Sequence, residues 1–416
     1  MEVLSFLFFV IKATWWFLTP LFLFFPVKKS WLYWRRKIYY DSLEFVLLEI
    51  RIPPDVLKTP KAMEYVFVGL HGVWDDLNFR DIWVKGEKLP SFSLEISGTG
   101  GDVHFYIHTQ KKLRNFVESQ VYSQYPDAEI IEASDYTNLV PPNLPNKDWD
   151  VWGTDLMLVR EDPYPIRKYI DFEEMVEERR LDPIASIAEI LNKLRAGEHI
   201  WIQIIIQPNG DLNKLHKEGE KVLTKLLGRK EEKKVGIGDA ALSSLGESVM
   251  LATGKTPEEE KKEDMLSPLE WRLSPGEREI LEQIEEKTAK IAFDTLIRFI
   301  YIGRNDVFSK TNIAALFGFF RLFNTFNLNS FRPNSKTLPK RSFVYFRKLR
   351  LHFRKMRIVM WYKWRRVLPG NITPMFQLNV EELATVFHLP GLIVKAPFMP
   401  RVETRRPPPP PGLPVG

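Results

Sequence analysis

The chain has 416 residues, of which 44% are hydrophobic and 27% are charged, so it is long enough for two or three domains with ordinary cores. It contains no cysteine, which excludes disulfides, thiol catalysis and cysteine-based metal sites. The net charge of +6 is unevenly distributed, because the segment 307–380 carries fifteen Lys and Arg but no Asp or Glu. Such a concentrated positive field favours a polyanion as partner, either nucleic acid or an anionic membrane surface.

The first segment, residues 1–40, is predicted to anchor the chain in a membrane. The run from Val3 to Val27 has Lys12 as its one charged residue, and a helix needs about 20 apolar residues to cross the hydrocarbon core. A cleaved signal peptide is disfavoured, because the start lacks basic residues and the run ends in bulky aromatics. A buried core helix fits this length and aromatic content poorly. A shallow, re-entrant segment is the main alternative, because Lys12 and two prolines interrupt the run.

Basic and aromatic residues follow the apolar run and set its expected orientation. Positive residues stay on the cytoplasmic side of a membrane, and no basic residue precedes the run. We therefore expect a single-pass protein of the inner (cytoplasmic) membrane, with its N-terminus outside and its bulk in the cytoplasm. The residues expected to contact lipid at the membrane interface are Lys28, Lys29, Trp31, Trp34, Arg35, Arg36 and Lys37.

Residues 43–135 predict a ferredoxin-like unit of the α+β class, with the element order β-α-β-β-α-β. Runs of apolar, β-prone residues indicate strands at 43–52, 92–96, 103–108 and 128–132. One helix is expected to begin at Thr59-Pro60, a capping residue followed by proline in the first turn, and another to cover 111–124. The glycine-rich turn 98–102 is interpreted as a hairpin rather than a dinucleotide loop, because no helix follows it.

Residues 150–400 predict a second ferredoxin-like unit, interrupted by long helical insertions. Strands are expected at 156–160, 200–207, 295–303 and 376–379, and helices at 183–195, 274–290 and 311–323. The stretch 228–272 is charged and aperiodic, which indicates a flexible insertion. The proline-rich tail 401–416 is predicted to form an extended polyproline II segment.

The positive charge is densest in 340–366, which is predicted to be a basic amphipathic helix. Its apolar residues recur at three- and four-residue steps, at Phe346, Leu349, Phe353, Met356, Met360 and Trp364. Three interpretations stay open: a helix packed on the body with a solvated basic face, a helix on anionic lipid, and a helix on nucleic-acid phosphates. The residues expected to bind a polyanion are Arg347, Lys348, Arg350, Arg354, Lys355, Arg357, Lys363, Arg365 and Arg366.

The sequence contains no group of residues that predicts an active site. Gly254-Lys255-Thr256 is similar to the end of a phosphate-binding loop, but Val249 stands where that loop needs glycine. His104 and His108 would share one strand face about 13 Å apart, which is too far for one metal ion. We therefore predict a non-enzymatic protein with no catalytic residues, no cofactor and no metal.

Several stretches together resemble one family. They include Pro60-Lys61-Ala62-Met63-Glu64, Ser274-Pro275-Gly276-Glu277-Arg278, and Leu378-Asn379-Val380-Glu381-Glu382-Leu383-Ala384 with His388-Leu389-Pro390. Over residues 43–414 the chain is similar to an uncharacterised, membrane-anchored domain family of candidate-phylum bacteria, found beside or fused to HerA/FtsK-like ATPases of type IV secretion or conjugation. The resemblance implies an adaptor or scaffold in DNA transfer that docks a separate ATPase, with DNA and further copies of the chain as additional partners.

Overall fold

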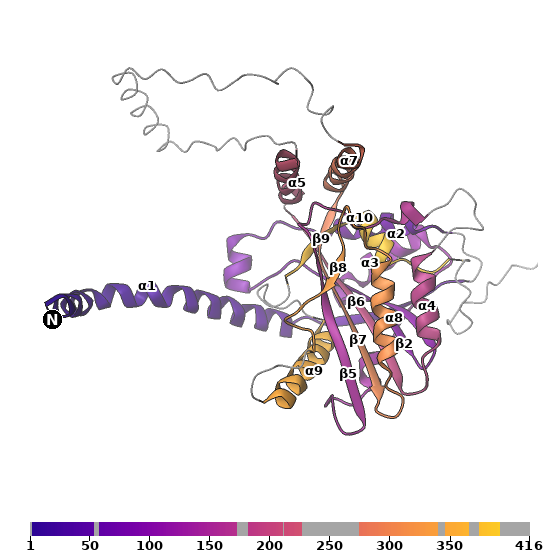
Figure 1. Ribbon diagram of the computed structural model, residues 1–416, viewed down its shortest axis with the longest axis horizontal. Coiled ribbons are helices and arrows are strands. Elements are labelled where there is room, and N and C mark those ends of the chain that lie inside the picture. Colours follow the sequence, from indigo (N-terminus) through magenta and orange to yellow (C-terminus); the bar gives the residue numbers. More distant parts are fainter. Residues whose placement is uncertain are drawn as a thin grey trace, which may run out of the picture.

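Nine strands form one antiparallel sheet in the computed structural model, which describes residues 2–53, 58–172, 182–210, 212–226, 274–339, 346–365 and 374–391 (Figure 1). The strands lie in the order β4-β1-β3-β2-β6-β7-β5-β8, and β9 pairs with one end of β7. The predicted insertion 228–272 and the tail 401–416 both lie wholly outside the described residues. The described body is therefore of the α+β class, as the sequence predicts.

The first half of the sheet comprises β1 (Phe45–Arg51), β2 (Phe92–Thr99), β3 (Asp102–Gln110) and β4 (Glu129–Glu132). The helix α2 (Pro60–His71) follows β1, and α3 (Arg114–Gln124) follows β3, so the elements come in the order β-α-β-β-α-β. In space the strands lie in the order β4-β1-β3-β2, which places β2 away from the outer edge.

The second half comprises β5 (Trp149–Leu158), β6 (Glu198–Pro208), β7 (Ala292–Arg304), β8 (Phe331–Pro333) and β9 (Phe376–Asn379). The helices α4 (Pro183–Asn192) and α8 (Lys310–Arg321) take the same places after β5 and β7 as α2 and α3 take after β1 and β3. The strand order β6-β7-β5-β8 therefore repeats that of the first half in reverse.

The last strand of the second half differs from the prediction. The sequence indicates it at 376–379, but β9 pairs with the Ala292–Thr295 end of β7, whereas β8 pairs with β5 at the edge of the sheet. Three residues are too few for an alternating pattern, so the sequence gives no signal for β8. The helix α5 (Leu212–Leu226) was also not predicted; it contacts α7 (Pro275–Ala289), and both project from one end of the sheet (Figure 1).

The two halves join through β2 and β6. These strands pair antiparallel from Phe92 opposite Ile206 to Thr99 opposite His199, so backbone hydrogen bonds continue across the junction. Glycine at position 98 is required there, because a Cβ atom would lie 2.6 Å from the Leu191 side chain of α4. The junction makes one continuous sheet from two segments that lie about 100 residues apart along the chain.

Helices cover both faces of the sheet. On one face α2, α3, α4, α8 and α10 (Val380–Val386) form a layer over the alternate apolar residues of the strands, among them Phe92, Leu94 and Ile96 of β2 (Figure 1). On the other face the 3-10 helix η3 (Tyr136–Leu139) and the helix α9 (Arg347–Trp364) pack over a smaller core that includes Trp201 and Ile300. Residues of β2 that point to this second face, such as Glu95, are therefore buried as well.

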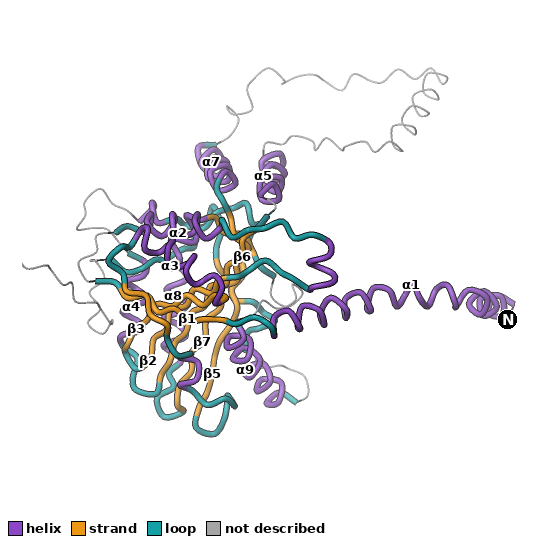
Figure 2. The backbone as a smooth tube through the Cα atoms, turned by 180° about the vertical axis from the view of Figure 1, so that it is seen from behind, coloured by secondary structure: helices purple, strands orange, loops and turns teal. Residues whose placement is uncertain are grey.

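The helix α1 (Glu2–Asp41) projects from the body as one continuous helix, seen from both sides in Figures 1 and 2. With 40 residues it is about 60 Å long at 1.5 Å per residue. Within the described part of the chain, no helix combines the length and the apolar character that crossing a membrane requires. The predicted membrane span therefore stays a prediction.

Candidate functional site

The predicted basic helix is present as α9, and its C-terminal half packs on the sheet. Residues 340–345 and Arg366 lie outside the described residues. The side chains that α9 buries are Ile358, Val359, Trp361 and Tyr362, which belong to the core on the second face of the sheet. Of the apolar row predicted from the sequence, Phe346, Leu349, Phe353, Met356 and Trp364 are exposed, whereas Met360 is partly buried against that core.

Arg365, predicted to bind a polyanion, is instead buried between two carboxylates of the protein. Its Nε and Nη2 atoms donate to Glu95 at 2.8 and 3.1 Å, and its Nη1 and Nη2 atoms donate to Asp135 at 2.7 and 3.0 Å. Such bidentate contacts use the planar fork of the guanidinium fully. Arg365 is therefore a docking residue of α9 and is unavailable to an external anion.

Glu95 is the centre of a buried polar network, which we call the Glu95 network: Ser93, Glu95, Asp135, Tyr136, Gln203, Tyr362 and Arg365. The hydroxyl groups of Ser93 and Tyr136 and the amide of Gln203 donate to its carboxylate at 2.6, 2.7 and 2.9 Å. Burial would raise the pKa of Glu95, but the charge and hydrogen bonds of Arg365 outweigh burial and leave that pKa lowered. The same balance lowers the pKa of Asp135 to about 2.

The C-terminal carbonyl groups of α9 also find donors in the sheet. Arg298 donates from Nη1 to the Trp361 carbonyl at 2.7 Å and from Nε to Asp155 at 3.0 Å, while Gln203 donates to the Tyr362 carbonyl at 3.2 Å. A cation at this end of a helix satisfies open carbonyls and complements the helix dipole. The sheet is thus built to receive this end of α9.

The other predicted cations differ in their contacts and exposure. Lys355 forms an ion pair with Asp150 of β5, and Arg354 donates to the Leu338 carbonyl at 3.3 Å, so both contribute to docking. Lys363 is partly exposed. The remaining cations of α9 are exposed, namely Arg347, Lys348, Arg350 and Arg357.

The residues predicted at the membrane interface lie where α1 meets the body. Trp31 donates from Nε1 to the Trp83 carbonyl at 2.9 Å, and the Lys28 ammonium lies 4.8 Å from the centre of the Trp83 ring. Trp83 belongs to the π-helix η1 (Asp81–Lys85). Trp34 and Arg35 stack on each other, Arg36 is partly exposed, and Lys29 and Lys37 are exposed.

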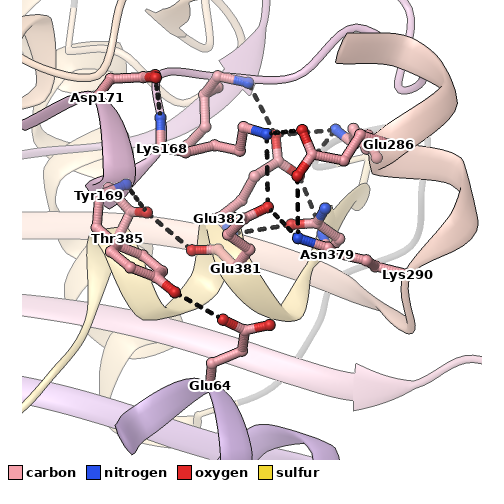
Figure 3. Close-up of polar contacts among 12 residues, drawn as sticks. Glu64, Lys168, Tyr169, Asp171, Glu286, Lys290, Asn379, Glu381, Glu382 and Thr385 are labelled. Carbon is pink, nitrogen blue, oxygen red and sulfur yellow. Dashed lines mark hydrogen bonds and ion pairs between the residues drawn. The ribbon is translucent and has the colours of Figure 1, made fainter. Parts of the chain in front are cut away.

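A second group of charges holds α10 in the helix layer; we call it the α10 charge cluster: the buried Lys168, Lys287, Glu381 and Glu382 with the partly exposed Glu286 and Lys290. Asn379 caps α10 in a capping box with Glu382, as Figure 3 shows. Glu382 also pairs with Lys287 at 3.0 Å, and both side chains are fully buried. Glu381 pairs with Lys290 at 2.7 Å and lies 3.6 Å from Lys168 (Figure 3).

Neighbouring hydrogen bonds tie the α10 charge cluster to the rest of the fold. The backbone amide of Tyr169 donates to the Thr385 hydroxyl at 2.8 Å. The phenolic hydroxyl of Tyr169 donates to Glu64 of α2 at 2.9 Å (Figure 3). His388, just after α10, lies 2.9 Å from Asp182, the capping residue of α4. The stretch 378–390, which carries part of the resemblance, is thus largely buried and connects α10 to α4 and α7 through hydrogen bonds and ion pairs.

A comparison with protein families found a match over most of the chain. Residues 44–397 match the family described as Domain of unknown function (DUF8128). The chain belongs to this family. A comparison with curated proteins found no match. The expectation of an uncharacterised domain family over most of the chain is confirmed, whereas the bacterial group and the association with ATPases stay predictions.

The match shows what the DUF8128 domain comprises. It runs from just before β1 to beyond α10, so it includes both halves of the sheet, the Glu95 network and the α10 charge cluster. The helix α1 lies before it. The family unit is therefore the whole nine-stranded body rather than either half.

Histidines in the DUF8128 domain take part in packing. The Nδ1 atom of His104 lies 2.6 Å from Glu49, whereas His108 stacks on Phe45, so these two histidines have separate partners. Burial lowers the pKa of His108 to about 4. Among the described residues, no group of three or more His, Asp or Glu is arranged to hold a metal ion.

Sequence reasoning missed the residues that receive α9 and α10, chiefly Glu95, Arg298 and Lys287. One signal was available: Ser93, Glu95 and Ser97 alternate with apolar residues in β2, which marks a second, polar face. Lys287 gave a weaker signal, because it lies three residues after Ile284 and shares its helix face. The partners of these residues come from distant segments, which no local pattern indicates.

Proposed function

We propose that this DUF8128 protein is a membrane-anchored, non-enzymatic scaffold whose body lies against the cytoplasmic face of the inner membrane. The observation that carries the proposal is the helix α1, which projects away from the body and exposes the aromatic residues Phe22, Phe24, Phe25, Trp31 and Trp34. Soluble proteins rarely expose such contiguous apolar surface without an interaction to cover it. The apolar run at 3–27 and the basic residues that follow it support a single pass with the N-terminus outside.

We also infer that each half of the sheet is a ferredoxin-like unit. The element order β-α-β-β-α-β and the strand order β4-β1-β3-β2 support this for the first half. The reversed order β6-β7-β5-β8 supports it for the second half. A body made of two such units offers a broad helix layer on one face and α9 on the other.

The scaffold role, rather than catalysis, is supported by the use of the buried charges. Glu95 and Asp135 are committed to Arg365, and Glu382 is committed to Lys287. Carboxylates held in this way by fixed cations stabilise the docking of helices and are poor proton carriers. The partner ATPase of HerA or FtsK kind rests on the family resemblance alone, and nucleic-acid binding by α9 likewise stays a prediction.

Membrane fractionation of the full chain tests the anchor. We expect the protein to stay with membranes through washes with high salt and alkaline carbonate and to leave them in detergent, because apolar burial is insensitive to salt. A matched variant, Phe22→Lys with Phe25→Lys, should be released by these washes. Recovery of the unaltered chain in the soluble fraction would contradict the proposal.

Because the chain contains no cysteine, single introduced cysteines can be labelled to test the orientation of the chain in the membrane. With one cysteine introduced at a time, Glu2→Cys should react with an impermeant thiol reagent applied outside intact cells. Ser123→Cys, exposed on α3, should react only after the cells are opened. Labelling of position 123 from outside would contradict a cytoplasmic body.

A further inference from the structure

The helix α9 has two apolar faces, and one of them is turned away from the body. The inner face packs on the sheet through Ile358, Val359, Trp361 and Tyr362. The outer row is Phe346, Leu349, Phe353 and Met356, whose exposed fractions are 76%, 52%, 47% and 37%. We call these four residues the outer row of α9.

Helical geometry makes the outer row continuous. Its members are separated by three, four and three residues, and residues at these spacings are neighbours on one side of a helix. At 100° per residue, the row lies on the side opposite Ile358 and Tyr362. The docking of α9 therefore fixes the outer row in an outward position.

Basic residues border the outer row. Arg350 and Arg357 lie along one border, and the partly exposed Lys363 lies about two turns beyond Met356 on the other side. The helix contains no acidic residue. An apolar row with cationic borders is the pattern of a helix that lies in a membrane interface, where the row enters the acyl region and the cations reach lipid phosphates.

The neighbouring surface has the same character. Phe79, just before η1, is 76% exposed, and Val84 within η1 is 51% exposed. The same π-helix contacts Lys28 and Trp31 of α1. In Figures 1 and 2, α9 lies on the side of the sheet from which α1 projects. The outer row thus lies on the side of the molecule where the proposed anchor leaves it.

We propose that the outer row of α9 inserts into the anionic leaflet of the membrane and forms a second contact there, which holds the body against the lipid. The inference rests on the proposed function for the presence of that membrane. Nucleic acid fits this face less well, because phosphates contact cations, whereas here the centre of the face is apolar and the cations are at its borders. An anionic bilayer offers both an apolar interior and a charged surface, so it matches the whole face.

A probe attached to the outer row tests this contact. The full chain carrying Phe353→Cys with an environment-sensitive fluorophore is reconstituted into vesicles of phosphatidylcholine, with or without phosphatidylglycerol. We expect a blue shift and protection from an aqueous quencher in the vesicles that contain phosphatidylglycerol, and a smaller effect in neutral vesicles. The same label at Ser123→Cys, an exposed position on α3, serves as the matched control and should stay quenched.

The charged borders are tested in the same chain. Adding Arg350→Glu and Arg357→Glu to the Phe353→Cys protein should abolish the blue shift in anionic vesicles, while the protein still floats with them through α1. Far-ultraviolet circular dichroism of the variant checks that the fold is kept.

Failure of the inference and failure of the proposed function give different results. If the labelled chain floats with vesicles but position 353 stays open to the quencher, the second contact is wrong and the anchor stands. If the chain does not float at all, the anchor is wrong. A blue shift produced by double-stranded DNA, and not by anionic vesicles, would overturn the inference in favour of nucleic acid.

Discussion

At the scale of single residues, buried ionisable groups on the second face of the sheet are matched by specific partners. Arg298 pairs with Asp155, and Arg365 pairs with Glu95 and Asp135. Arg365 adopts a left-handed backbone conformation with φ of 49°, which costs a residue other than glycine on the order of 1 kcal/mol. The ion pairs of its side chain offset this cost, so the charge network and the end of α9 depend on each other.

His199 gives the protein a specific dependence on pH. It is buried on β6, where it stacks against Trp149 and its Nδ1 atom lies 3.2 Å from the Thr99 hydroxyl. Burial lowers its pKa to about 4, below the usual value near 6.5. Between these two values the unfolded chain binds a proton that the folded chain does not, so stability falls as the pH falls through this window.

We expect acidification from pH 7 to pH 4.5 to cost the unaltered chain up to about 3 kcal/mol more than His199→Gln, since each pKa unit corresponds to 1.36 kcal/mol. Urea unfolding of the two proteins in the same detergent, at both pH values, measures the difference. His216→Gln, which alters an exposed histidine of α5, is the matched control and should follow the unaltered chain. An equal loss in the unaltered chain and His199→Gln would contradict the assignment.

At the scale of elements, the sequence predicted most helices and strands but not which face of α9 would pack. Its periodicity identifies an apolar row, and α9 in fact has two, because Ile358 and Tyr362 form a second one. The choice between them is made by Glu95, Arg298 and Gln203, which lie on strands far away in the sequence and receive the end of the helix. The choice is therefore tertiary and has no local signal.

The docking of α9 should depend strongly on Arg365. We expect Arg365→Met to lower the free energy of unfolding by about 3–5 kcal/mol, because it leaves Glu95 buried without its cation. Adding Glu95→Gln should recover part of this loss, since the amide oxygen can still accept from Ser93 and Gln203 while the amide NH2 group donates to the Tyr136 hydroxyl. Arg350→Met, an exposed change on the same helix, should stay within about 0.5 kcal/mol of the unaltered chain. Urea unfolding followed by tryptophan fluorescence measures all four proteins, and a double variant no more stable than Arg365→Met would contradict this account.

At the scale of the whole molecule, the nine-stranded sheet combines two halves of similar organisation. The sequence indicates most elements of both halves, β8 excepted, but it does not indicate that the halves pair through β2 and β6. Either strand could equally have formed a protected edge, and their apolar alternation suits many partners. The fit of Gly98 against Leu191 and the eight facing residue pairs from Phe92 to Thr99 exist only once both halves are folded.

Because β2 and β6 pair along their whole junction, we expect the two halves of the sheet to unfold together. Phe299 of β7 is fully buried in the second half, where it packs on Trp152, Phe317 and Phe320. We expect Phe299→Ala to destabilise the body by about 3–5 kcal/mol, through lost apolar burial and the cavity that remains. Because β6 shares its hydrogen bonds with β2, amide exchange should accelerate in β2 and β3 of the first half as much as in β6 and β7. Hydrogen–deuterium exchange of the full chain, followed by mass spectrometry, measures this, with Tyr122→Ala on the exposed side of α3 as the control. Acceleration confined to β5, β6 and β7 would mean that the halves are independent folding units joined only by a shared strand pair.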